Sequence, residues 1–83
     1  MSGSPFLQTG YTIYENPSDV PGFYVMRGWV MMDDGTPQCA LEAAATPVGA
    51  QGLEALRAIL RSQGRVNMGR EQNDDPVIVE TWI

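Results

Sequence analysis

The chain has 83 residues, ten carboxylates against five arginines for a formal net charge of −5, one cysteine, and neither histidine nor lysine. This composition excludes an intramolecular disulfide, a standard zinc site and a serine hydrolase that uses histidine as its base. The acidic balance also argues against direct binding to nucleic acid, and no run of ~20 apolar residues suggests a membrane span. We therefore expect one cytoplasmic domain over residues 10–83, after a loose N-terminal segment over residues 1–9.

The first half of the domain has the composition of strands separated by turns. We predict strands over residues 11–15 and 23–32, because these segments are rich in β-branched and aromatic side chains. A third strand is expected over 38–45, where the chain reverses after the turn signal at 33–35. Prolines, asparagine, aspartates and glycines in 16–22 and 33–35 predict the turns between them. The third strand remains open to a second interpretation, since its three alanines would equally extend a helix.

One helix follows. Thr46 and Pro47 predict an N-cap and a first helical residue, although glycines in the next turns favour a later start near Ala50. Gly64 is placed to end the helix in the left-handed conformation. Helical spacing gives an apolar stripe of Leu53, Leu56, Ile59 and Leu60 and a wetter side of Gln51, Glu54, Arg57 and Arg61.

The last part of the chain predicts a strand over 65–69, a polar loop over 71–76 and a terminal strand over 77–83. The element order is then β-β-β-α-β-β. Short connections favour antiparallel pairing. The fold class is therefore α+β, with a small antiparallel sheet of four to five strands and one α-helix packed on one face.

Aromatic side chains on the strands are too numerous for one small helix to cover, so we expect some of them to form an exposed contact surface. Carboxylates of the 71–76 loop would steer a basic partner to it. The candidate protein-binding residues are Tyr14, Tyr24, Trp29 and Trp82, together with Glu71, Asp74 and Asp75.

Four arginines form a secondary candidate patch in an otherwise acidic chain: Arg57, Arg61, Arg65 and Arg70. Arg57 and Arg61 are one helical turn apart, where like charges repel, so an external anion or carboxylate would suit them. A solvated helix face is the alternative. The aspartate pairs at 33–34 and 74–75 are interpreted as turn residues, and Cys39 as a buried structural residue, because no histidine is present to activate the thiol. No cofactor or metal is expected.

Three segments together resemble a group of small uncharacterised proteins of bacteriophages and prophages. They are Asn16-Pro17-Ser18-Asp19-Val20-Pro21-Gly22, Val25-Met26-Arg27-Gly28-Trp29 and Asp74-Asp75-Pro76-Val77-Ile78-Val79-Glu80-Thr81-Trp82, and the resemblance spans about residues 11–83. It implies expression in a bacterial host. Small acidic phage proteins often inhibit a host machine, and anti-CRISPR proteins are one such class.

The sequence thus predicts a phage-encoded, non-enzymatic module that inhibits a host or defence protein by covering its binding surface. The partner would be a protein or nucleoprotein complex with a basic surface. The alternative is a self-associating structural or virion assembly protein, in which the terminal strand pairs with a second copy to give a homodimer. A small enzyme that uses carboxylates and arginine is a third, weaker hypothesis.

Overall fold

The computed structural model describes residues 10–71 and 75–83, and within them the predicted α+β fold is confirmed. Strands β1 (Gly10–Glu15), β2 (Phe23–Met31) and β3 (Pro37–Pro47) come first, followed by α1 (Ala50–Ser62), β4 (Asn67–Gly69) and β5 (Ile78–Trp82). The strands form one antiparallel sheet in the spatial order β3-β2-β1-β5-β4. The predicted loose segment over residues 1–9 lies outside the described residues.

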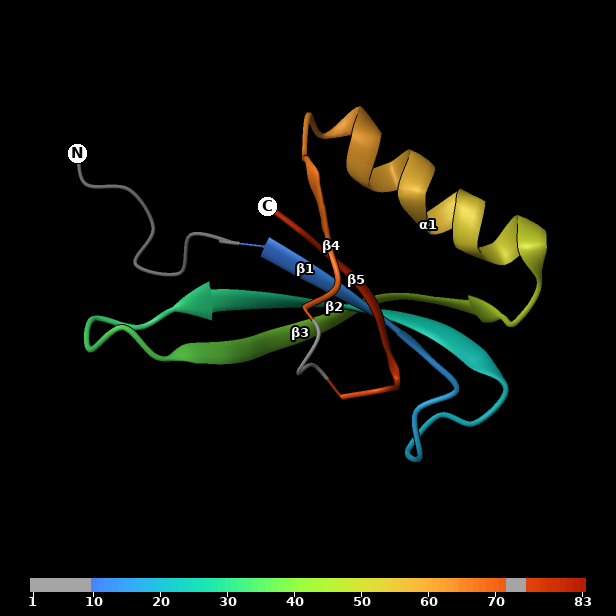
Figure 1. The fold of residues 1–83 in the computed structure, drawn as a ribbon, viewed down its shortest axis with the longest axis horizontal. Coiled ribbons are helices and arrows are strands. Elements are labelled where there is room, and N and C mark those ends of the chain that lie inside the picture. Colours follow the sequence, from blue (N-terminus) through green and yellow to red (C-terminus); the bar gives the residue numbers. More distant parts are fainter. Residues whose placement is uncertain (1–9, 72–74) are drawn as a thin grey trace.

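The helix lies along one face of the sheet (Figure 1). Leu56 and Leu60 from α1 pack there with Ile13, Met26 and Trp82 from three neighbouring strands. Leu53 is partly buried against this cluster, whereas Ile59, predicted to belong to the same stripe, is exposed. The core therefore sits between α1 and the centre of the sheet. We call the opposite side of the sheet the back face.

Two boundaries of the helix were predicted with different success. Gly64 terminates α1 two residues after its last helical residue, as predicted. It has a φ of 77° and donates its N–H to the Arg61 carbonyl, while the Arg65 N–H donates to the Leu60 carbonyl. This is the Schellman arrangement that favours glycine. The predicted N-cap at Thr46 is wrong, because Thr46 and Pro47 are still paired with β2 as the end of β3. Gly49 is the N-cap and α1 begins at Ala50, which confirms the later start.

The third strand is longer than predicted. It pairs with β2 from Pro37 to Pro47, and the three alanines lie in the strand rather than in a helix. Two register shifts interrupt this pairing, so that β3 is an irregular edge strand. The side chain of Cys39 lies outside the described part, and its predicted burial stays a prediction.

Candidate contact surface and the polar network behind it

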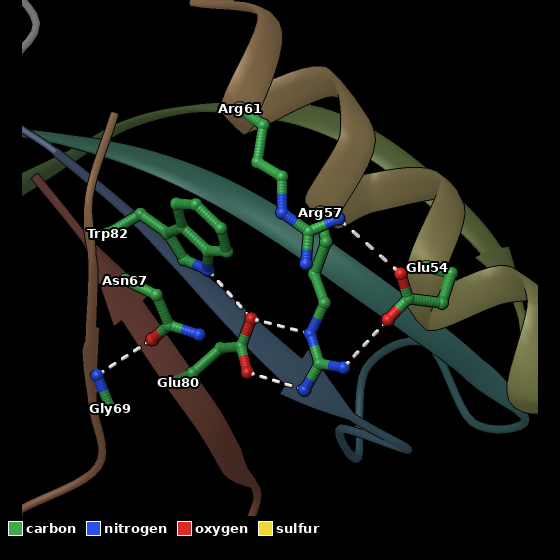
Figure 2. A network of polar contacts seen from close by, with 7 residues as sticks. All are labelled: Glu54, Arg57, Arg61, Asn67, Gly69, Glu80 and Trp82. Atoms are coloured by element: carbon green, nitrogen blue, oxygen red, sulfur yellow. Dashed lines mark hydrogen bonds and ion pairs between the residues drawn. The ribbon is translucent and has the colours of Figure 1, made fainter. Parts of the chain in front are cut away.

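A buried carboxylate links the helix to the sheet (Figure 2). Glu80 in β5 is only 4% exposed. It accepts two hydrogen bonds from the Arg57 guanidinium, from Nε to Oε2 at 3.0 Å and from Nη2 to Oε1 at 2.8 Å. The indole Nε1 of Trp82 donates to Oε2 at 2.7 Å. The carboxylate is therefore satisfied inside the core, as a buried charge must be.

The ionisation of this network follows from its contacts. Burial raises the pKa of Glu80, but hydrogen bonds from Arg57, Trp82 and Asn67 outweigh burial and hold the pKa below its ordinary value. Hydrogen bonds to Glu80 and Glu54 raise the pKa of Arg57, although burial lowers it. Both groups are consequently charged at neutral pH, and the network is an ion pair with a neutral indole donor.

The sequence did not predict this network. Arg57 was placed on the wet side of the helix, yet its guanidinium reaches inward to Glu80 and outward to Glu54, whose Oε1 lies 3.0 Å from Nη1. Glu54 also lies 3.5 Å from Arg61. The two like charges on the helix are thus offset by carboxylates of the same chain. A signal was present in the sequence, since Glu80 is the one charged residue of the mostly apolar segment 77–83.

The remaining arginines do not gather with these two into one patch. Arg65 stacks over the ring of Tyr11, with its guanidinium carbon 4.5 Å from the ring centroid. Arg70 lines a separate open hollow of about 590 Å³ with Glu15, Pro76 and Val79. The predicted secondary patch is therefore divided into three environments.

Two of the predicted contact aromatics are in the core, and the expectation that they are exposed is wrong. Trp82 is 3% exposed and Tyr24 is 7% exposed, and both belong to the cluster beneath α1. Trp82 is directed inward because it shares a strand face with Glu80. Tyr24 is directed inward in the same way, because it shares a strand face with the core residue Met26.

The other two, Tyr14 and Trp29, are half-buried and lie on the back face. Alternation along β1 and β2 places them opposite the core residues Ile13 and Met26. Trp29 is paired with Gly10, and a Cβ at Gly10 would lie only 2.5 Å from the Trp29 ring. The Trp29 ring therefore lies over Gly10, close to the Trp82 carbonyl oxygen of β5.

Beyond this indole, three apolar side chains complete a row on the back face. Val66 and Ile83 exchange both backbone hydrogen bonds at 2.9 and 3.0 Å, and Met68 follows two residues after Val66. Each of the three is more than half exposed. Their strand neighbours Asn67 and Trp82 lie on the helix side near Glu80 (Figure 2), so alternation directs Val66 and Ile83 to the back. Met68 lies at the register shift of β4, beside Gly69, which pairs with Thr81 of the back face. We call this set the apolar strip: Trp29, Val66, Met68 and Ile83.

A second hollow borders the same face at the other end of the sheet. It has a volume of about 540 Å³ and is lined by Tyr14, Pro17, Asp19, Arg27 and Asp75, among others. Arg27 forms an ion pair with Asp19 and lies over the Tyr14 ring at 5.3 Å from its centroid. The structure thus brings together two predicted contact residues, Tyr14 and Asp75, that are distant in sequence.

The predicted acidic residues have separate surroundings. Asp75 is exposed and its Oδ1 accepts the Val77 N–H at 3.1 Å, which is the turn role expected of it. Glu71 is also exposed, and Asp74 lies outside the described residues. Asp34 has a similar turn role, because it accepts hydrogen bonds from the Thr36 hydroxyl and N–H, which lower its pKa.

Within residues 10–71 and 75–83, no group of three or more His, Cys, Asp or Glu side chains is arranged to hold a metal ion. No helix in that part is long and apolar enough to cross a membrane. No family model, curated protein or solved structure matches the chain. The resemblance to small phage proteins therefore stays a prediction.

Proposed function

We propose that this chain is a non-enzymatic protein-binding module that docks its back face on a partner with a basic surface. The observation that carries the proposal is the uneven covering of the sheet. One helix lies along one face (Figure 1). The back face buries Thr12 and Val25, but it also presents the apolar strip, with Val66, Met68 and Ile83 each more than half exposed. A row of exposed apolar side chains beside a half-buried tryptophan has the composition of an interface centre.

Charge favours a basic partner over a second copy. Each copy carries a net charge of −5, so two copies repel each other, while a basic surface attracts the chain. Asp19 and Asp75 at the hollow add carboxylates at the border of the back face. In keeping with the resemblance, we propose that the partner is a bacterial host or defence protein whose own binding surface the module covers.

The test has two stages. Tagged protein is used to isolate a stoichiometric partner from bacterial lysate, and the affinity of the purified pair is then measured by calorimetry for variants. Met68→Ser and Val66→Ser on the apolar strip should each weaken binding about tenfold or more, as expected for residues at an interface centre.

Ile59→Ser is the matched control, because Ile59 is an exposed apolar residue of α1 and lies outside the apolar strip. It should leave the affinity unchanged. Loss of binding with Ile59→Ser but not with the strip variants would place the interface on the helix and contradict the proposal. Thermal unfolding of all three variants shows whether the fold is retained.

A further inference from the structure

The burial of β5 runs against its hydrophobic pattern. Alternation divides the segment into two sets, Val79, Thr81 and Ile83 on one side and Glu80 and Trp82 on the other. The apolar and β-branched set would be the usual choice for the core. In the structure Glu80 is buried and Ile83 is more than half exposed. The core therefore takes the carboxylate together with Trp82 and excludes the isoleucine, while Val79 is partly buried against the core cluster.

A bulge in the ladder between β1 and β5 causes this inversion. Tyr14 pairs with Ile78, but the next residue of β1, Ile13, pairs with Glu80. Val79 is the surplus residue between them. If the ladder continued from the Tyr14–Ile78 pair without the bulge, Val79 would face Ile13 and Glu80 would face Thr12. A shift of one residue thus moves every later side chain of β5 to the other face.

The contacts of Glu80 supply a reason for the observed register. The two bonds from Arg57 reach the carboxylate only when Glu80 points toward α1. The bond from Trp82 does not depend on the register, because Glu80 and Trp82 share a strand face in both registers. In the bulge-free register Glu80 would lie on the back face, where Thr12 is flanked by Arg27 of β2. Without Arg57, the observed register would leave a buried carboxylate without its counter-charge, which is strongly unfavourable.

We propose that Arg57 selects between two registers of β5 and thereby determines which side chains this strand presents on the back face. In the observed register β5 contributes Thr81 and Ile83 to that face. In the alternative register it contributes Glu80 and Trp82, which replaces an apolar surface with an acidic and aromatic one. The proposed choice of register does not depend on the proposed function. Only the effect of the register on partner binding rests on that function.

The decisive variant is Arg57→Leu, studied as the free protein by NMR. In the observed register Tyr11 is paired with Trp82. The alternative register pairs Tyr11 with Thr81 instead. We expect the cross-strand contacts between Tyr11 and Trp82 to be lost in Arg57→Leu and contacts between Tyr11 and Thr81 to replace them. Retention of the Tyr11–Trp82 contacts in this variant would overturn the proposal.

The double variant Arg57→Leu/Glu80→Leu is the matched control. Leucine at position 80 suits the core without a counter-charge, so the Tyr11–Trp82 pairing should return. If the double variant kept the Tyr11–Thr81 pairing, the register would not depend on the carboxylate and the proposal would be wrong.

If Arg57→Leu does not fold, deletion of Val79 tests the bulge that separates the two registers. Without the surplus residue, Ile78 and Glu80 become neighbours and a regular ladder keeps Glu80 opposite Ile13. The domain should remain folded with Tyr11 paired with Trp82. Pairing of Tyr11 with Thr81 in the deletion variant would show that Val79 is not the surplus residue, contrary to the proposal. None of these measurements requires the partner, so their failure is distinct from failure of the proposed function.

Discussion

Glu80 shows how a single side chain couples the fold to pH. Its pKa is lowered in the folded chain, because bonds from Arg57 and Trp82 outweigh the effect of burial. The unfolded chain therefore binds more protons between the folded pKa and the ordinary value of 4.5. In that window the free energy of unfolding rises with pH. The stabilisation by Glu80 is complete above the ordinary pKa and is lost as the pH falls through the folded pKa.

We accordingly expect the free energy of unfolding in urea to fall as the pH is lowered from about 5 to about 3, the range in which a glutamate of this kind titrates. Glu80→Gln should flatten part of this fall, because glutamine does not titrate. Glu54 and Asp34 also have lowered pKa values and titrate in the same direction, so a residual slope remains. If the free energy of unfolding fell equally steeply with pH in the two proteins, Glu80 would not contribute to the pH dependence.

Gly10 is a position at which a single added carbon atom, a Cβ, should destabilise the fold. A Cβ at this position would lie 2.5 Å from the Trp29 ring and 2.7 Å from the Trp82 carbonyl oxygen. We expect Gly10→Ala to lower the free energy of unfolding by about 1–3 kcal/mol, the usual cost of overpacking. In a Trp29→Ala background only the backbone contact remains, so the loss should be smaller. Urea unfolding of the four proteins in this cycle measures the difference.

Among the elements, the end of α1 depends on one glycine. Gly64 has a φ of 77°, which an L-residue with a Cβ adopts at a cost of about 1 kcal/mol. Gly64→Ala should lower the free energy of unfolding by about that amount. Gly64→Asn should cost less, because asparagine tolerates the left-handed conformation better. Equal losses for the two variants in urea unfolding would indicate that the backbone strain is not the cause.

The sequence predicted elements whose signals are local. The glycine after α1 and the turn at residues 33–35 depend on a few neighbouring residues, and both are where they were expected. The exposure of Trp82 and Tyr24 was predicted wrongly, because the face that a strand buries depends on its pairing partners. For β5 the bulge at Val79 reverses that face, and no pattern within residues 77–83 reveals a bulge.

The same limit applies to the helix. Arg57 was assigned to the wet side of the helix by its position in the 3.6-residue period. Its long side chain nevertheless reaches Glu80, 23 residues later in the sequence. The contact surface was only partly predictable for the same reason. Tyr14, Trp29 and Asp75 were named from their types, but the apolar strip depends on the pairing of Val66 with Ile83.

For the whole molecule, the order of the strands changes the expected route to self-association. The terminal strand was predicted to pair with a second copy, but β5 lies inside the sheet between β1 and β4. The edges are β4, which has three residues, and β3, which has proline at both ends and two register shifts. Short strands, prolines and bulges all disfavour edge-to-edge pairing.

We therefore expect the chain to sediment as a monomer, independent of concentration, at low salt where the repulsion between acidic copies is strongest. Analytical ultracentrifugation over a wide range of protein concentration measures this. A dimer that strengthens at high salt and is lost in Met68→Ser would instead assign the apolar strip to self-association.

The two tryptophans lie on opposite faces of the sheet, Trp82 beneath α1 and Trp29 on the back face. They are the chain's only indoles, so its intrinsic fluorescence has two sources with separate meanings. With Trp29 replaced by phenylalanine, the emission reports the core and its carboxylate. With Trp82 replaced instead, it reports the outer surface. The molecule thus carries an optical probe for folding and another for binding, with no added label.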